Sequence, residues 1–218
     1  MTEGRGVPAS DLPETWEVVR HEVLGRGRVS DFVEDDVLTP SGEPITRQYL
    51  THPGAVAILA VDDDDRVVVI DQYRHPVGMT LVEVPAGLLD AEGESSLAAA
   101  ERELAEEALL AAADWRVLVD LLSSPGGNQE TLRVFLARGL AEAPRPDGFE
   151  VEGEEAHMSV HWVPFADLLD GIYAGTFGSP GLVVGVLAYE AARRGGRLDQ
   201  LRHPGAHWPA RHAIAARG

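Results

Sequence analysis

The chain has 218 residues, of which 44% are hydrophobic, so it is able to bury a sizeable core and is not predominantly disordered. Its 18 cationic residues, all arginine, stand against 36 Asp and Glu, which gives a formal charge of −18. Such an acidic surface repels nucleic acids and anionic membranes, so neither is expected as a partner. Without cysteine the chain has no disulfide and no thiolate metal site, and without an apolar leader or span we expect a cytoplasmic protein.

The N-terminal part predicts a small sheet. After a flexible leader, residues 1–12, three β-like runs at 16–24, 28–38 and 46–51 indicate a meandering antiparallel sheet within residues 13–52. Two further runs, at 54–61 and 66–73, are rich in β-branched residues. The acidic stretch 62–65 between them predicts a hairpin, and we expect its four aspartates to form a solvated loop.

The main domain is predicted to cover residues 53–195. A short strand at 81–84 ends at Pro85, and Ala86 and Gly87 lead through a loop to a helix at 96–110. The elements that follow are strands at 115–122, 131–137 and 157–163 and helices at 164–173 and 180–194. The tail, residues 196–218, has weak periodicity, which allows it to be ordered only by a partner.

Glutamates cluster on the predicted helix at 96–110. Glu103, Glu106 and Glu107 are related by i, i+3 and i+4, so they share one helix face and repel one another at neutral pH. A divalent cation would relieve that repulsion. The plain alternative is an exposed, alanine-rich amphipathic helix, because glutamate and arginine favour helices. The preceding strand, the turn at Pro85 and the neighbouring Arg102 favour a site.

The segment from Gly87 to Leu110 resembles the Nudix box: Gly, five residues, Glu, seven residues, then Arg-Glu-aliphatic-x-Glu-Glu-x-Gly-aliphatic. Its positions are filled by Gly87, Glu94, Arg102, Glu103, Leu104, Glu106, Glu107 and Leu110. Two departures occur. Six residues separate Gly87 from Glu94, a lengthening that a loop tolerates. Leu109 replaces the closing glycine, so we expect the helix to run on or end differently, because leucine resists the left-handed conformation.

The resemblance implies an α/β (α+β) Nudix fold, with a mixed β-sheet sandwiched between helices and a small N-terminal antiparallel β-sheet. Glu103 and Glu107, one turn apart, are the expected ligands of Mg²⁺ or Mn²⁺, which neutralises a pyrophosphate and activates water. The resemblance adds the carbonyl of Ala86 as a ligand. Arg102 and Glu106 are expected to orient the catalytic carboxylates, with Glu94 as their partner and Gly87 as a structural residue.

Pro125, 15 residues after Leu110, lies in the run Ser124-Pro125-Gly126 and resembles the ADP-ribose pyrophosphatase branch of the family. An ordinary Pro-Gly turn is the alternative. The resemblance implies a set of substrate-binding residues, Arg47, Arg74, Glu83, Leu88, Ser124, Pro125, Gly126 and Glu130. Guanidinium groups suit a phosphate or an adenine face, but either arginine could instead pair with surface carboxylates.

The branch implies a catalytic glutamate on a late loop, for which Glu155 is the first choice and Glu154 the second. A flexible acidic loop is the alternative. The expected reaction is metal-dependent hydrolysis of ADP-ribose to AMP and ribose 5-phosphate, in a homodimer built through the N-terminal sheet. Another nucleoside diphosphate sugar as substrate, or a non-catalytic nucleotide sensor, stays open.

Overall fold

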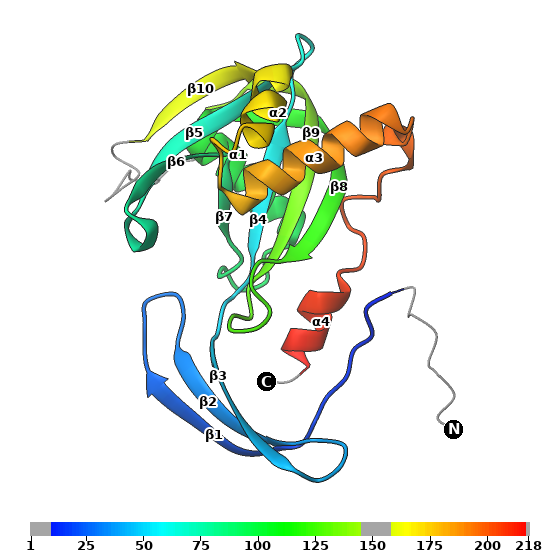
Figure 1. Cartoon of the computed structure of the whole chain (residues 1–218). Helices are drawn as coiled ribbons and strands as arrows, with labels where there is room; N and C mark the ends of the chain where they lie inside the picture. The colour runs from blue at the N-terminus through cyan, green and yellow to red at the C-terminus, as the bar shows by residue number, and fades with distance from the viewer. Residues whose placement is uncertain (1–9, 145–157, 217–218) are drawn as a thin grey trace.

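The N-terminal sheet projects from the rest of the molecule in the computed structural model, which describes residues 10–144 and 158–216 (Figure 1). Its strands are β1 (Val18–Gly25), β2 (Phe32–Leu38) and β3 (Pro44–Leu50). They pair antiparallel in the order β1-β2-β3, which confirms the predicted meander. β2 starts later than expected because the Asp31 carboxylate accepts the Gly27 N–H at 3.2 Å and shapes a turn before it.

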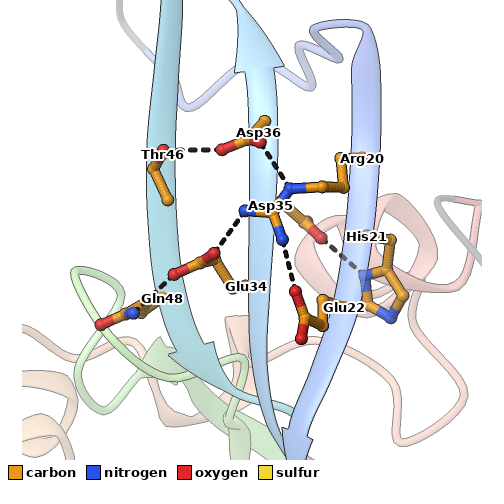
Figure 2. Close-up of polar contacts among 8 residues, drawn as sticks. All are labelled: Arg20, His21, Glu22, Glu34, Asp35, Asp36, Thr46 and Gln48. Carbon is orange, nitrogen blue, oxygen red and sulfur yellow. Dashed lines mark hydrogen bonds and ion pairs between the residues drawn. The ribbon is translucent and has the colours of Figure 1, made fainter.

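Arg20 ties the outer strand of this sheet to its centre. Its guanidinium on β1 donates hydrogen bonds to Glu34 and Asp36 on β2 (Figure 2). From β3, Thr46 Oγ1 donates to Asp36 and Gln48 Nε2 donates to Glu34, both at 2.6 Å. Charged side chains of β1 and β2 and neutral polar side chains of β3 therefore connect all three strands across one face of the sheet.

Two further sheets form the body of the molecule (Figure 1). The first has the order β7-β4-β9-β8 and contains β4 (Ala55–Ala60), β7 (Ala86–Leu88), β8 (Leu110–Leu122) and β9 (Thr131–Glu142). The second has the order β10-β5-β6 and contains β5 (Arg66–Arg74), β6 (Met79–Glu83) and β10 (Ser159–Pro164). β4 and β9 are parallel and the other pairs are antiparallel, so the body holds the expected mixed sheet.

Helices cover both sides of this body. They are α1 (Ser96–Ala108), α2 (Phe165–Tyr173), α3 (Pro180–Arg194) and α4 (Pro209–Ala215), with short 3-10 helices at His75–Val77 and Leu198–Gln200. Leu104 of α1 packs in a core with Ile58 and Phe135. Val186 of α3 packs in a second core with Leu59, on the opposite face of β4. This confirms the expected architecture, a mixed sheet sandwiched between helices.

The hairpin predicted between β4 and β5 forms only at its turn. Asp62 Oδ1 accepts the N–H groups of Asp64 and Arg66 at 3.0 and 2.8 Å, and three of the four aspartates are exposed, as a solvated loop requires. Beyond the single bridge Val61 to Val67 the strands separate into different sheets. The hairpin prediction was wrong because β4 already pairs with β7 and β9.

β8 and β9 are longer than the sequence predicted. β8 begins at Leu110 and β9 ends at Glu142, and these two residues are paired in register. The added stretches are rich in alanine, which has low β propensity, so the antiparallel ladder decides their conformation. The helices predicted at 164–173 and 180–194 are confirmed as α2 and α3.

Helix α1 ends where a glycine would end it, although the residue there is leucine. Leu109 has φ 56° and ψ 38°, the left-handed conformation, and its N–H donates to Ala105 O at 3.2 Å. Our expectation that the helix runs on or ends differently was therefore wrong. Leu110 is buried and starts β8, and Leu109 O accepts the N–H of Ala143 at 2.9 Å, so tertiary contacts outweigh a backbone cost of about 1–2 kcal/mol.

The C-terminal segment packs on the body rather than waiting for a partner. Trp208 is 3% exposed and belongs to the core beneath α1. The buried Arg133 donates to Ala206 O at 2.9 Å. The expectation of a tail ordered only by a partner was wrong. It was based on weak hydrophobic periodicity, whereas a single buried aromatic side chain, which produces no periodic pattern, holds the segment on the body. In the described part of the chain, no helix is long and apolar enough to cross a membrane.

Candidate active site

The start and inner face of α1 follow from its local sequence. Ser95 Oγ accepts the N–H of Ala98 at 3.1 Å, which satisfies a free donor of the first turn. Ala99, Ala100 and Leu104 are buried against the sheet. This arrangement leaves the predicted glutamates on the flank of the helix that meets β7.

Arg102 gathers three of the predicted glutamates around one guanidinium. Its Nε and Nη2 donate to the two carboxylate oxygens of Glu94 at 3.0 and 3.1 Å. Its Nη1 donates to Glu103 at 2.7 Å and to Glu106 at 3.0 Å. The hydrogen bonds that Arg102 donates to Glu94, together with the nearby negative charges of Glu103 and Glu106, raise the pKa of Arg102 above its usual value. The arginine therefore stays charged and ties the loop before α1 to the helix.

The backbone of β7 lies directly against these carboxylates. Ala86 and Gly87, which we expected to lead directly into a loop, pair with β4 as part of β7, so the loop to the helix starts only after Leu88. Glu107 is 8% exposed, and its Oε2 accepts the N–H of Ala86 at 2.9 Å. A Cβ added to Gly87 would lie 1.9 Å from Glu103 Oε1. A side chain at residue 87 would therefore displace the Glu103 carboxylate from this position.

The donor chemistry of this flank suits a hard divalent cation. Glu103 and Glu107 offer carboxylate oxygens and Ala86 offers a carbonyl, which are the ligand types that Mg²⁺ and Mn²⁺ prefer. Among the described residues, no three His, Asp or Glu side chains are grouped to hold a metal ion by themselves. Mg²⁺ in proteins usually takes one or two carboxylates and completes its shell with water and substrate phosphates. The donors of this flank fit such an ion.

Two of the predicted substrate residues bind each other. Arg74, at the end of β5, donates to both carboxylate oxygens of Glu83 on β6 at 2.8 and 2.9 Å. Arg47 lies on the N-terminal sheet, where its Nη1 donates to the carbonyl of Thr46 at 2.8 Å. The structure therefore brings Arg74 and Glu83 together on the body and carries Arg47 on the other sheet.

The predicted segment at Ser124 forms a turn. The carbonyl of Ser124 accepts the N–H groups of Gly127 and Asn128 at 3.1 and 3.0 Å, so that Pro125 and Gly126 lie within the turn. This geometry is the Pro-Gly turn that the sequence offered as an alternative, and it leaves a role in binding open.

The same loop joins the body to the N-terminal sheet. Leu50, at the end of β3, donates its N–H to Gly127 O and accepts the N–H of Gln129, both at 3.0 Å. The N–H of Glu130, another predicted residue, donates to Asn128 Oδ1 at 2.8 Å. These bonds fix the loop against the end of β3.

A groove of about 440 Å³ lies where the N-terminal sheet meets the body. It is lined by Arg28, Val29, Thr51, His52, Pro53, Leu88, Asp90 and Gln129. Leu88 was predicted in the site, whereas Arg28, His52 and Asp90 were not. Only Asp90 had a signal, because it lies inside the loop between the first glycine and the first glutamate of the motif.

The two candidates for the catalytic glutamate, Glu154 and Glu155, lie outside the described residues.

Comparison with known proteins gives consistent matches. The NUDIX domain family matches residues 51–177. The chain is 42% identical over 180 residues to the ADP-ribose pyrophosphatase of Mycobacterium tuberculosis, over 83% of this chain and 86% of that protein. It is 38% identical over 125 residues to the ADP-ribose pyrophosphatase of Bacillus subtilis, over 57% of this chain and 67% of that protein. A solved structure of an ADP compounds hydrolase superposes with a TM-score of 0.68 at 22% identity, over 87% of this chain and 100% of that one, and supports the fold.

Proposed function

The chain belongs to the Nudix family, and from this membership we propose that it hydrolyses the diphosphate bond of ADP-ribose to AMP and ribose 5-phosphate. The substrate is supported by the ADP-ribose pyrophosphatases to which the chain is 42% and 38% identical. The chemistry is supported by the carboxylates of α1 and their contact with β7. We also propose that the protein acts in the cytoplasm. The chain has no cysteine and so forms no disulfide, which fits a reducing compartment.

The observation that carries the proposal is the approach of α1 to β7. Glu103 occupies the space beside Gly87, and Glu107 accepts the Ala86 N–H at 2.9 Å. A helix that needed these glutamates only for solubility would turn them toward water. Here the Glu103 carboxylate lies beside Gly87 and the Glu107 carboxylate bonds to the backbone of β7, which is an arrangement for coordinating a further group.

The residues divide the work as follows. Glu103, Glu107 and the carbonyl of Ala86 would hold Mg²⁺ or Mn²⁺, which when bound neutralises phosphate charge and lowers the pKa of water. Arg102 holds Glu103 and Glu106 in position through bonds of 2.7 and 3.0 Å. Such support tunes ligand orientation, so its loss costs activity without removing a ligand.

For the base that activates water we propose Glu155, with Glu154 as the alternative. The proposal rests on their position in the sequence, before β10, because both lie outside the described residues. A carboxylate in this role must reach the attacking water by a hydrogen bond.

The groove between the two parts of the molecule is our candidate for the substrate. Leu88 lines it, and the loop that carries Ser124, Pro125, Gly126 and Glu130 supplies Gln129 to its wall. Arg74 with Glu83, and Arg47 from the N-terminal sheet, are proposed as further contacts. Arg74 is able to bind a phosphate because its side chain is 43% exposed even while it holds Glu83.

We propose that residues 13–52 are a dimerisation region and residues 53–195 the catalytic domain. The N-terminal sheet exposes apolar side chains, among them Val19 at 53%, Leu24 at 42% and Phe32 at 40%. Exposed apolar surface on an edge strand marks an interface between proteins. Light scattering after gel filtration should give twice the mass of one chain, and the mass of a single chain would contradict the dimer.

One experiment tests the activity. The protein is incubated with Mg²⁺ and, separately, ADP-ribose, ADP-glucose, GDP-mannose and a nucleoside triphosphate, and the product nucleotides are separated. We expect AMP and ribose 5-phosphate from ADP-ribose, at a higher kcat/KM than for the other compounds. Preferred cleavage of a nucleotide sugar would reassign the substrate, and tight ADP-ribose binding without turnover of any compound would indicate a sensor.

A further inference from the structure

The joint between the N-terminal sheet and the body lies at Pro53 and Gly54. Gly54 has φ +89°, its N–H donates to His52 Nδ1 at 3.0 Å, and its carbonyl accepts the N–H of Leu89 at 3.0 Å. Three residues of this connection, Thr51, His52 and Pro53, line the groove. The conformation of the joint therefore sets one wall of the groove.

Arg211, on α4, reaches this joint from the far end of the chain. Its Nη1 donates a hydrogen bond to the carbonyl of Pro53. A Cβ added at Gly54 would lie 2.5 Å from the same nitrogen, so the guanidinium fills the space over the joint. In Figure 1, α4 lies near the connection from β3 to β4. Arg211 is partly buried, and this burial lowers the pKa of its guanidinium below the usual value.

The segment before Arg211 is anchored in the body. The ring of Trp208 is buried, with the guanidinium carbon of Arg133 4.5 Å from its centroid. Arg133 is itself buried and donates to both carboxylate oxygens of Asp120 at 2.7 and 3.0 Å. Arg202 donates to the same carboxylate at 2.8 Å. The buried aromatic ring and the ion pair of Arg133 with Asp120 therefore hold this segment in a fixed place on the body.

The anchor is connected rigidly to the arginine. The N–H of His212 donates to the carbonyl of Trp208 at 3.1 Å, so the first turn of α4 links Trp208 to Arg211. The position of the guanidinium is therefore set by the core of the body. Movement of the N-terminal sheet relative to the body would break its bond to Pro53.

We propose that residues 201–212 form a C-terminal clamp that fixes the joint, and that Arg211 is thereby a positioning residue for the substrate groove. The proposal rests on the proposed function, since the groove is taken as the ADP-ribose site. A groove held in its binding shape loses less conformational freedom when substrate binds. The clamp therefore acts on substrate affinity and leaves the carboxylates of α1 unchanged.

The test compares Arg211→Ala with Arg211→Lys and with the control Arg197→Ala, which removes an exposed arginine outside the clamp. In Arg211→Ala we expect the KM for ADP-ribose to rise about tenfold while kcat changes less than about twofold. Arg211→Lys keeps one donor for the Pro53 carbonyl and should recover part of the KM. Arg197→Ala should match the unmodified protein.

Hydrogen exchange supplies a readout that needs no turnover. The amides of Leu50, Gly54, Leu89 and Gln129 bond across or beside the joint, so their exchange should accelerate severalfold in Arg211→Ala and not in Arg197→Ala. Unchanged exchange would overturn the clamp. Faster exchange with an unchanged KM would overturn its role in the groove. If the unmodified protein does not cleave ADP-ribose, faster exchange still supports the clamp, and the proposed function alone fails.

Discussion

Two arginines in this chain each bind three carboxylates, and the two clusters have opposite designs. Arg20 binds Glu22, Glu34 and Asp36 on neighbouring strands of the N-terminal sheet, whereas Arg102 binds Glu94, Glu103 and Glu106 on and before one helix. The side chains of Glu22, Glu34 and Asp36 are 56%, 17% and 27% exposed, against 17%, 13% and 11% for Glu94, Glu103 and Glu106. Excess negative charge is screened in water and costly where water is excluded.

The partners of the carboxylates differ in the same way. In the N-terminal cluster Glu34 and Asp36 each receive a second hydrogen bond, from Gln48 and Thr46 of the third strand. In the α1 cluster the neighbouring Glu107 adds another carboxylate, held by a backbone N–H. Similar ion pairs therefore join strands in one region, and in the other they position the carboxylates that we propose as cation ligands.

The largest expected effect separates the two clusters by activity. Glu107→Gln removes a proposed metal ligand but keeps an oxygen that accepts the Ala86 N–H. We expect kcat/KM for ADP-ribose to fall on the order of 10²–10³-fold, the scale for losing one group that stabilises the transition state. The control is Glu34→Gln in the N-terminal cluster, which should keep full activity. Equal kinetics for the two variants would break the comparison.

Replacing the arginine of each cluster by alanine should separate the two clusters in the same way, with a smaller loss of activity. Arg102→Ala releases Glu94, Glu103 and Glu106, and we expect activity to fall about 10–100-fold, as for groups that orient metal ligands. Arg20→Ala should leave kcat unchanged and instead lower protection of the N-terminal sheet in hydrogen exchange. Steady-state kinetics and exchange on both variants make the check. A loss of kcat in Arg20→Ala would show that the sheet cluster also serves catalysis.

The α1 cluster was readable in the sequence because its geometry is local. The spacing of Glu103, Glu106 and Glu107 places them on one helix face whatever the rest of the chain does. The N-terminal cluster was not readable, since Arg20 lies 14 residues from Glu34, and their meeting depends on the strand register. The register itself shifts between Val18 and Arg20, and no sequence pattern announces that irregularity.

The wrong predictions share a cause. The local sequence of β4 and β5 is typical of a hairpin, but β4 pairs with β7 and β9 instead. Leucine disfavours the left-handed conformation, but Leu109 adopts it because β8 starts at the next residue. Trp208 lies in a tail without hydrophobic periodicity, so the sequence does not indicate that its side chain is buried in the core. The helices, most strands and the motif could be predicted from local sequence preference. The pairing of strands into sheets and the groove could not, because tertiary contacts decide them.

Replacing Leu109 should sharpen the contrast on the side of stability. Leu109→Gly relieves the left-handed strain, and because the side chain is 44% exposed little burial is lost. We expect a gain of about 0.5–1 kcal/mol in the free energy of unfolding, measured in urea, with unchanged kcat. Leu109→Ala keeps its Cβ and should gain nothing. A loss of stability in Leu109→Gly would mean that leucine is held there by packing.

The smallest expected effect concerns acid. Hydrogen bonds from Arg20, and then from Gln48 and Thr46, lower the pKa of Glu34 and of Asp36 from ordinary values of 4.5 and 3.8. A lowered folded-state pKa stabilises above the unfolded value and loses that contribution as pH falls through the folded value. Protection of the N-terminal sheet should therefore weaken below about pH 4. In Arg20→Ala this acid dependence should shrink, and an undiminished dependence would assign it to other groups.

The central claim is that the carboxylates of α1, and not those of the N-terminal sheet, hold the divalent cation. The direct measurement is calorimetric titration of Mn²⁺ into the protein with a non-hydrolysable ADP-ribose analogue. We compare the unmodified chain with two double variants. The first combines Glu103→Gln with Glu107→Gln in α1, and the second combines Glu34→Gln with Asp36→Asn in the N-terminal sheet. Mn²⁺ affinity should fall at least about tenfold in the first double variant and stay unchanged in the second. Full affinity in the first double variant would contradict the account.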